Sequence, residues 1–549
     1  MRFNKQGVCL SPSTRDILLT LCGGHFLDKT IESLKKGNTM RATGDNWDLK
    51  ISMHNMRKKS QNIDLHLFAS NFIQNRIRVD HLPNDNPIGD IKTVNRQKFS
   101  LSIAEWKSYI SSTKVIVSRI LIDFFPEFHM FKSVYPKHIP HQYSKEMSQK
   151  SLIATLPIID ADEKSYSDCA LILRTYEAWI AEIYHKAGII EKLPEVTNQE
   201  IPEGQAAAPG QPHAHVIFTQ NDPMKNCKVP TAGDQLTRVR FAGAKDLLKA
   251  AHTPSDRFEH CSPFKPVMWH TKASLLQYSY GLLFSPDSIT QVGTLKYFRK
   301  KLKRKNVTPN KVLNSYEGCE ELFLSLGKAY IIVAAMQFFG MENLEESPKI
   351  HKFPSNLIHQ SQAKKKEYLD DVLDKFVREY ILQTNPVITE KEDCIKNYGL
   401  CSIFLTILIL QLKDTAKEGD GDRNLINQKL LLAVFKSLGP YSKYAIEMFT
   451  SIAQIKCTLT PRLSESYKWG FFVNWRGGAG KNIEDDVAQE ICNGISKRVV
   501  QRMGPNKSIS SISKICKATN GIKEITEQFD ENFDIHFFLY ISTFYTTYK

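Results

Sequence analysis

The segment WRGGAGKNIEDDVAQEICNGISK, residues 475–497, places three glycines and a lysine directly before a run of acidic residues. Its GGAGK part invites comparison with a P-loop, which needs Gly, four residues, Gly-Lys and then Ser or Thr. Here Trp475 stands at the first glycine position and Asn482 at the Ser/Thr position, and the acids that follow would repel a triphosphate. The segment is therefore interpreted as a loop that leads into a helix.

This helix is predicted over residues 482–502, with Asn482 as N-cap and Asp485 at the N3 position of a weak capping box. At about 100° per residue, one face carries Asp486, Glu490, Asn493 and Lys497. The other side carries Val487, Ile491, Ile495 and Val499. Two carboxylates one turn apart can hold a divalent cation. Any surface helix shows such a polar stripe, however, so periodicity alone favours a solvated face.

Composition indicates a soluble globular protein, because 42% of the 549 residues are hydrophobic and 24% are charged. This length is typical of two to four domains. The eleven cysteines include no CxxC pair, which disfavours a disulfide framework or a zinc ribbon and favours a reducing, intracellular compartment. The apolar runs at 329–341 and 401–410 are shorter than the ~20 residues that span a bilayer, so no membrane association is expected.

A net charge of +15 is the first functional signal, because excess Lys and Arg attracts polyanions, and nucleic acid is the commonest one inside cells. The densest basic run is RKKLKRK, residues 299–305, with the cations Arg299, Lys300, Lys301, Lys303, Arg304 and Lys305. It is interpreted as a contact to a phosphate backbone or as a nuclear import signal. A solvated helix end is the alternative.

The chain is divided into residues 1–191, a Pro/Gly-rich linker at 192–214, residues 215–310 and a mainly helical part at 311–549. Helices are predicted at 65–77 and 169–189, and a strand at 215–219 (HVIFT). After residue 313, helices are predicted at 318–341, 364–383, 400–413, 428–438 and 483–502. The aromatic tail at 533–549 is either a strand or unrelated sequence.

Two further polar clusters are GDNWDLK at 44–50 and GDQLTRVR at 233–240. Asp45 and Asp234 both follow a glycine, and in the simplest interpretation they are turn or N-cap residues. His270 beside Trp269 is, on the same basis, a core histidine. His213 and His215 have His-x-His spacing without a partnering Cys or His pair, so no zinc is expected.

Together these segments resemble a eukaryotic, multicopy family of unknown function that is often treated as transposon-associated. The matching motifs are GDNWDLK with LHLF and NRI downstream, GDQLTRVRFAGAK, PVMWHTK, GTLKYF, VAAMQFFGM and the run from FVNWRGGAGK to GPNKS. They occur in family order from about Gly44 to Ala518. Motif residues without an assigned role are Asn46, Asp48, His66, Thr237, Arg240, Trp269, His270, Asn482 and Asn493.

The chain departs from the family pattern at three places. Met268 stands where the family has Asp before Trp-His, and Cys492 lies in a Glu-Ile-Cys-Asn run where the family has Glu-His-Leu-Asn. Asn75 replaces an aspartate before Arg76. Because these changes remove acidic or imidazole groups from the motifs, they put catalysis by this copy in question.

The resemblance implies a transposase-like enzyme with a ribonuclease-H-like core, which cleaves and joins phosphodiesters with two metal ions. Such enzymes use a carboxylate on the first strand, one after a later strand and one on a helix. The residues that match are Asp45, Asp234 and Glu490, with Asp486 as a further ligand to Mg²⁺ or Mn²⁺. Asn493 and Lys497 are assigned to phosphate contact.

The predicted fold is α/β and predominantly helical, with a small mixed sheet of ribonuclease-H-like type and a large helical insertion. The predicted function is that of a transposon-derived, DNA-binding, nuclear protein, either an active metal-dependent nuclease and strand-transferase or a copy that has lost this activity. The alternative is a non-catalytic intracellular interaction or scaffold protein, whose acids only cap and solvate helices.

Overall fold

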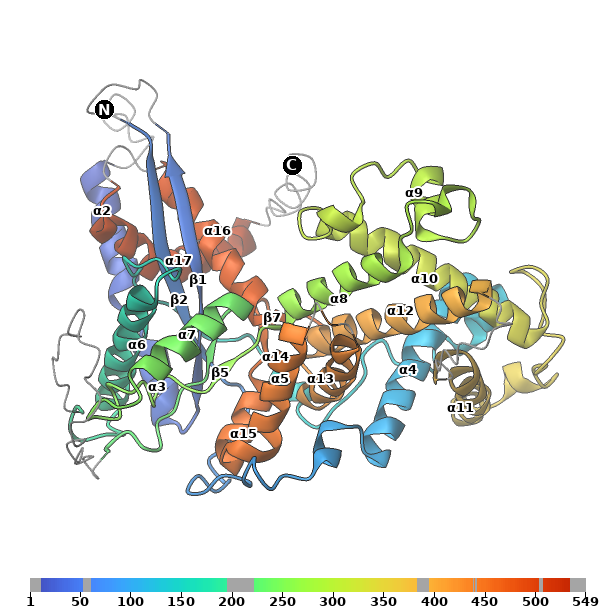
Figure 1. Cartoon of the computed structure of the whole chain (residues 1–549), viewed down its shortest axis with the longest axis horizontal. Helices are drawn as coiled ribbons and strands as arrows, with labels where there is room; N and C mark the ends of the chain where they lie inside the picture. The colour runs from blue at the N-terminus through green and yellow to red at the C-terminus, as the bar shows by residue number, and fades with distance from the viewer. Residues whose placement is uncertain are drawn as a thin grey trace, which may run out of the picture.

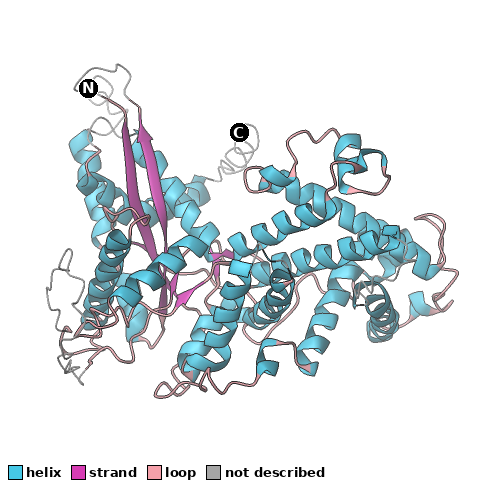
Figure 2. Cartoon of the chain, in the orientation of Figure 1, coloured by secondary structure: helices cyan, strands magenta, loops and turns pink. Residues whose placement is uncertain are grey.

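The computed structural model describes residues 11–52, 61–194, 222–382, 394–437, 439, 442–502 and 507–533. This part of the chain is predominantly helical around a small mixed sheet of five strands (Figure 2). The sheet and its covering helices form one side of the molecule, and most other helices gather on the opposite side (Figure 1). The α/β, predominantly helical class predicted from sequence is thus confirmed.

The five strands are β1 (Met40–Ile51), β2 (Ile63–Gln74), β3 (Ile153–Thr155), β4 (Thr231–Ala232) and β5 (Phe264–Lys265), in the order β3-β2-β1-β4-β5. β1 is central and pairs antiparallel with β2 and parallel with β4. β2 pairs antiparallel with β3, and β4 pairs parallel with β5. A separate antiparallel hairpin joins β6 (Phe472–Asn474) to β7 (Asn482–Glu484).

The helices around the sheet are α2 (Pro12–Gly24), α3 (Asp28–Lys35), α6 (Tyr166–Lys186), α7 (Gln235–Leu247), α16 (Asp485–Arg502) and α17 (Ile509–Phe533). The other helices are α4 (Ile103–Phe124), α5 (Ser144–Met147), α8 (Met268–Leu283), α9 (Leu295–Lys301), α10 (Tyr316–Phe339), α11 (Gln362–Val377), α12 (Cys394–Glu418), α13 (Gly421–Lys436), α14 (Ser442–Ala453) and α15 (Pro461–Trp469). Short 3₁₀ or π segments are η1 (Arg96–Phe99), η2 (Pro126–Phe131), η3 (Ser288–Thr290), η4 (Pro309–Lys311), η5 (Leu357–His359), η6 (Arg378–Leu382) and η8 (Gln454–Thr458).

Strand β2 contradicts the helix predicted at residues 65–77. Phe68 and Phe72 pack into the core on the α6 side, whereas Leu67 and Ala69 pack into the core on the α17 side. Because both faces of the sheet are covered, apolar residues follow one another and the two-residue period of a strand is lost. The remaining apolar spacing then fits a helix equally well, and the prediction was wrong for this reason.

The helix predicted at residues 169–189 is confirmed as most of α6. The mainly helical character predicted after residue 313 is also confirmed, with α10, α11, α12, α13 and α16 at the expected places. The strand predicted at 215–219, most of the linker at 192–214, His213 and His215, and nearly all of the tail at 533–549 lie outside the described residues. The division of the chain into segments stays a prediction.

The helical side of the molecule has its own core, to which α4 from the N-terminal third also contributes. The apolar runs at 329–341 and 401–410 lie within α10 and α12, which are 24 and 25 residues long. Within the described part of the chain, these two helices are long and apolar enough to cross a membrane, judged by length and composition alone. Residues such as Ile331 and Ile407 are fully buried in the helical core, as is common for core helices of soluble proteins. The absence of a membrane partner stays a prediction.

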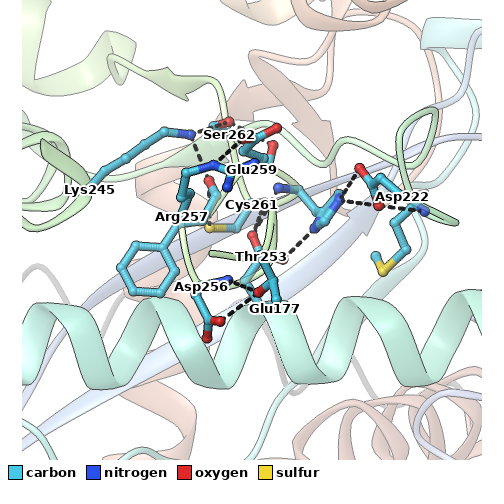
Figure 3. A network of polar contacts seen from close by, with 12 residues as sticks. Glu177, Asp222, Lys245, Thr253, Asp256, Arg257, Glu259, Cys261 and Ser262 are labelled. Carbon is cyan, nitrogen blue, oxygen red and sulfur yellow. Dashed lines mark hydrogen bonds and ion pairs between the residues drawn. The ribbon is translucent and has the colours of Figure 1, made fainter. Parts of the chain in front are cut away.

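A buried histidine, His260, ties α6 to the segment that precedes β5. Its ring Nδ1 lies 2.6 Å from Glu177 Oε2, and its Nε2 lies 3.0 Å from Asp222 Oδ2. Glu177 also accepts the backbone N–H groups of His260 and Cys261 (Figure 3). Burial opposes the charge, but the hydrogen bonds and charges of Asp222 and Glu177 raise the pKa of His260 to about 9.

This pKa predicts a stability contribution that depends on pH. A histidine whose pKa rises from 6.5 to about 9 on folding stabilises the fold fully below pH 6.5 and loses this effect as pH rises through 9. At about 1.4 kcal/mol per pH unit, the contribution is about 3 kcal/mol. Urea unfolding at pH 6 and pH 9.5 is expected to show that His260→Gln destabilises strongly at pH 6 and much less at pH 9.5. An equal loss at both values would contradict the charged state of His260.

Candidate functional site

Strand β1 is held against helix α16 by its odd-numbered side chains. The bonds join Arg41 to Asp485, Thr43 Oγ1 to Gln489 Oε1 (2.9 Å) and Trp47 Nε1 to Ser496 Oγ (2.8 Å). Side chains alternate between the faces of a strand, so Asp45 points to the same helix. A central strand buried on both faces thus carries one carboxylate at its middle, aimed at the helix that carries Glu490.

Asp45 and Glu490 are hydrogen-bonded to each other. Burial, this hydrogen bond and the charge of Glu490 raise the pKa of Asp45 to about 8, and the charge of Asp234 adds to the shift. At neutral pH the pair therefore shares a proton, because two carboxylates in contact cannot both stay ionised without a cation. The structure thus brings together two of the three predicted catalytic residues, which are far apart in the sequence.

Asp234 follows β4 directly and caps helix α7, where its Oδ1 accepts the backbone N–H of Thr237 at 2.7 Å. Because β4 runs parallel beside β1 at Ala42 and Thr43, this cap lies next to the strand that carries Asp45. The charge of Asp234 raises the pKa of Asp45 and also that of His270. Asp234 is therefore an N-cap residue, as the simplest interpretation holds, and a close neighbour of the acidic pair.

Asp486 holds the start of helix α8. Its carboxylate accepts the backbone N–H groups of Trp269 and His270 at 3.4 and 3.1 Å, and its Oδ2 lies 2.9 Å from His270 Nδ1. Burial opposes the charge on the imidazole, but the hydrogen bond and charge of Asp486 raise the pKa of His270 to about 8. Asp486 therefore positions an imidazolium beside the acids, and its role as a metal ligand stays a prediction.

The polar face of α16 is half buried, so it is not the fully solvated stripe that periodicity favours. Asp486 and Asn493 are buried, and Glu490 is exposed at the edge where it meets Asp45. On the predicted apolar side, Ile491 is 37% exposed. The reason is that β1 presents polar side chains to α16, which periodicity within the helix alone cannot reveal.

The predicted N-cap also proved wrong, because α16 begins at Asp485 and Asn482 lies in β7. Pairing with Asn474 holds Asn482 in extended backbone. The side-chain amide of Asn482 donates to the backbone oxygens of Met147 and Lys417, each at 3.1 Å. Asn482 thus fixes the entry to α16 from the side rather than capping it.

A buried ion cluster that the sequence did not reveal involves Arg41, which lies on the same face of β1 as Asp45. Asp485 accepts from Arg41 Nη2 at 2.9 Å and from Lys265 Nζ at 2.7 Å, and all three side chains are at most 4% exposed. Despite its burial, the charges of Arg41 and Lys265 keep the pKa of Asp485 below its usual value. Asn75 Oδ1 accepts from Arg41 Nη1 at 2.7 Å.

Three motif residues converge on Glu163, on the opposite face of β1. Asn46 Nδ2 donates to Glu163 at 2.9 Å, Thr237 Oγ1 donates to its other oxygen, and Arg240 lies 3.5 Å away. Burial raises the pKa of Glu163, and the charge of Asp234 adds to this effect. No local sequence signal marks Glu163, because its partners come from distant segments.

The other predicted residues occupy several places. Asp48 and His66 form an exposed cross-strand pair, with 2.8 Å between Oδ1 and Nδ1. Lys497 Nζ lies 5.8 Å from the centre of the Trp47 ring, and Asn493 Oδ1 accepts from Gln489.

The basic run at 299–305 begins in the last turn of α9, far from β1 (Figure 1). Two of its cations are already engaged within the protein. Arg299 donates to the backbone oxygen of Lys305 at 2.8 Å, and Arg304 pairs with Glu321 at 2.9 Å. The structure therefore does not bring this run to the acidic cluster, and its contact with nucleic acid stays a prediction.

Oxygen ligands of the kind that Mg²⁺ and Mn²⁺ prefer are present on Asp45, Glu490 and Asp234. As positioned, no group of three or more His, Cys, Asp or Glu among the described residues is arranged to hold a metal ion. Asp45 and Glu490 bond to each other, and Asp234 caps α7. The chemistry of these donors suits such an ion, which would replace the shared proton of the pair, and metal binding here stays a prediction.

One family model matches this chain over residues 90–537, which is most of its length, and its description is a family of unknown function (DUF6589). The chain belongs to the DUF6589 family. The DUF6589 match includes Asp234, Asp486 and Glu490, whereas Asp45 precedes it. No curated protein and no solved structure matches the chain significantly. Family membership therefore supplies no activity, and the site has to be judged by its chemistry.

Proposed function

We propose that this chain is a transposon-derived, DNA-binding protein of transposase type, which cleaves or joins phosphodiesters with Mg²⁺ or Mn²⁺. The observation that carries the proposal is the convergence of Asp45, Glu490 and Asp234 at the central strand of the sheet. Acidic side chains rarely approach one another in a folded protein unless a proton or cation is shared between them. In this proposal, the close approach of the carboxylates lowers the stability of the fold, and the protein tolerates this loss because the carboxylates together bind a metal ion.

The sheet supports the same proposal. The five strands form one mixed sheet in the order β3-β2-β1-β4-β5. The resemblance implies a carboxylate on the first strand, one after a later strand and one on a helix. Asp45 lies on β1, Asp234 directly after β4 and Glu490 on α16, and α8 to α15 lie between Asp234 and Glu490 in the chain, which supports the proposal of a helical insertion. This is an analogy of fold, which supports a function less strongly than the site does.

In the proposed reaction, Asp45, Glu490 and Asp234 would hold a divalent cation through their carboxylate oxygens. Such an ion would supply activation of a water or 3′-hydroxyl and neutralisation of charge on the leaving oxygen. His270, held by Asp486, places a positive charge beside the same acids. Because its pKa is about 8, this imidazole is charged at neutral pH and attracts a phosphate.

The location proposed for the protein is intracellular, with the nucleus favoured by the net charge of +15. Ten of the eleven cysteines lie in the described part of the chain, and among these ten Cys169, Cys227, Cys261, Cys319, Cys457 and Cys516 are free and buried. Free buried thiols are typical of proteins in reducing compartments, which supports this location.

Nicking of supercoiled plasmid in Mg²⁺ or Mn²⁺ tests the proposal. Glu490→Gln keeps the shape of the side chain and is expected to slow nicking about 100-fold or more, because metal-assisted charge stabilisation contributes several kcal/mol. Glu367→Gln, an exposed change on α11, is the control and is expected to nick like the wild type. Equal rates for the wild type and Glu490→Gln, or no nicking by either, would refute the assignment.

The second candidate function is that of a non-catalytic interaction protein. It is favoured by the engagement of Asp486 with α8 and by Met268 and Ile491, which stand where the resemblance implies Asp and His. In that case the plasmid stays intact with either metal, and the acids serve only to join α16 to β1 and α8.

A further inference from the structure

The glycine-rich loop between β6 and β7 is fixed by hydrogen bonds rather than by packing. Gly477, Gly478 and Gly480 adopt φ values of 78°, 96° and 67°, which favour glycine. Asn474 accepts the N–H of Gly477 at 2.8 Å and donates to the backbone oxygen of Gly478 at 2.9 Å. Gly478 N–H donates to the backbone oxygen of Ser148 at 2.7 Å. The loop therefore has one defined shape.

This loop closes over a cavity of about 110 Å³. Its lining includes His138, Ser144, Ser148, Glu418, Gly480 and Asn482. A side chain at position 480 would not fit, because its Cβ would lie 2.5 Å from the His138 ring. The cavity is thus large enough for several water molecules or for the edge of a planar group, and the loop glycine keeps it open.

The floor of the cavity accepts hydrogen bonds. Asn482 is 3% exposed, and its Oδ1 has no partner within the described part of the chain. Glu418 is 9% exposed and places Oε1 2.8 Å from His138 Nδ1. A buried oxygen without a partner is costly, so these acceptors favour a ligand that donates, such as an amino group.

The chain segments beside the cavity, called the rim here, are in contrast cationic. Five exposed Lys and Arg residues each directly precede or follow, in the sequence, a residue that lines the cavity or forms the loop, namely Lys137, Lys145, Lys417, Arg476 and Lys481. No ion pair joins any of these five to a carboxylate among the residues that the structure describes. Unpaired cations around a polar cavity attract phosphate groups. A free triphosphate is disfavoured inside, because it would face the Glu418 carboxylate.

We propose that this loop and cavity, the glycine-loop site, bind one nucleotide unit of a nucleic-acid strand. Its phosphates contact the cations of the rim, and the exocyclic amino group of its base donates to Glu418 and Asn482. This inference rests on the proposed function, because it takes nucleic acid as the partner. It adds the surface of the protein that contacts the nucleic acid. The loop leads through β7 directly into α16, which carries Glu490, so a strand bound here lies on the segment that enters the acidic cluster.

Fluorescence anisotropy with a single-stranded oligo(dA), measured in EDTA so that no cleavage occurs, tests the phosphate contacts. Arg476→Ala with Lys481→Ala is expected to weaken binding about tenfold or more and to lower the slope of log K against log salt by about 1.4, since each lost contact contributes about 0.7. Lys35→Ala with Lys36→Ala removes two exposed cations at the end of α3 and is the control. Equal slopes for the two double variants would overturn the proposal.

An abasic strand of the same length tests the base contact without any substitution in the protein. The wild type is expected to bind oligo(dA) about tenfold more tightly than the abasic strand, and Glu418→Gln is expected to narrow this difference. Equal affinity of the wild type for both strands would overturn the proposal. Displacement of the oligonucleotide by an equal concentration of AMP would also overturn the proposal, because the site would then bind free nucleotides.

The outcome is separable from that of the nicking experiment. If nicking is absent but Arg476 and Lys481 control binding, the proposed catalysis fails and the glycine-loop site stands. If nicking depends on Glu490 but the Arg476/Lys481 variant binds normally, the glycine-loop site fails and the proposed catalysis stands.

Discussion

Replacing Asp485 by alanine is expected to lower the free energy of unfolding by about 3–5 kcal/mol, because it leaves Arg41 and Lys265 buried without their shared carboxylate. Burial already lowers the pKa of Lys265 to about 8, and loss of Asp485 would lower it further, until the amine loses its proton. Thermal and urea unfolding of the purified variant measure the effect. This is the largest stability change that we expect from a single substitution near the site.

The control for this experiment is Asp48→Ala on the same sheet. Asp48 is 56% exposed and pairs with His66, and such a pair contributes about 1 kcal/mol or less. Adding Lys265→Met to Asp485→Ala is expected to recover part of the lost free energy of unfolding, since it removes one of the two buried cations that Asp485→Ala leaves unpaired. A loss for Asp485→Ala no larger than that for Asp48→Ala would show that the ion cluster does not hold α16 to β1.

Replacing Asp45 by asparagine is expected to stabilise the protein at neutral and alkaline pH. The pKa of Asp45 is raised from 3.8 to about 8 on folding, so the wild type loses stability as pH rises between these values. Asparagine stays neutral and still donates a hydrogen bond to Glu490. We expect the advantage of the variant to grow by about 2 kcal/mol between pH 5 and pH 8, after allowing for the partial exposure of the pair.

Unfolding curves of the wild type and Asp45→Asn at pH 5 and pH 8 measure this difference, with Asp48→Asn as the exposed control. Millimolar Mg²⁺ at pH 8 is expected to raise the melting temperature of the wild type but not that of Asp45→Asn, because ligands stabilise the state that binds them. A variant less stable than the wild type at pH 8 would contradict the raised pKa. The stabilised variant is also expected not to nick DNA, because the proposed metal site then lacks one of its carboxylates.

Local sequence patterns predicted those parts of the fold that depend on neighbours along the chain. The spacing of apolar residues predicted α6 and the later helices, since each of these helices is buried either on one face or on all sides. It failed at β2, where two covered faces remove the alternation that marks a strand. Strands β4 and β5 span two residues each, too few for any periodic signal, and they form because their neighbours in the sheet are in place.

The site shows the same division. Asp45, Asp234 and Glu490 were proposed from motif order, and the structure places Asp45 and Glu490 in contact with Asp234 nearby. Arg41, Lys265 and Glu163 were missed, because each is recognisable only through partners tens to hundreds of residues away. The structural role of these three charged residues can be recognised only once folding has brought their partners together.

The side-chain contacts between β1 and α16 join two segments that are synthesised at very different times. Arg41 and Asp485 are 444 residues apart, so at about 5–20 residues per second the strand leaves the ribosome roughly 20–90 s before its partner helix exists. Throughout that interval Arg41 lacks its counter-ion and Asp45 lacks its neighbour Glu490. A nascent chain therefore cannot carry a complete acidic cluster until α16 has been synthesised.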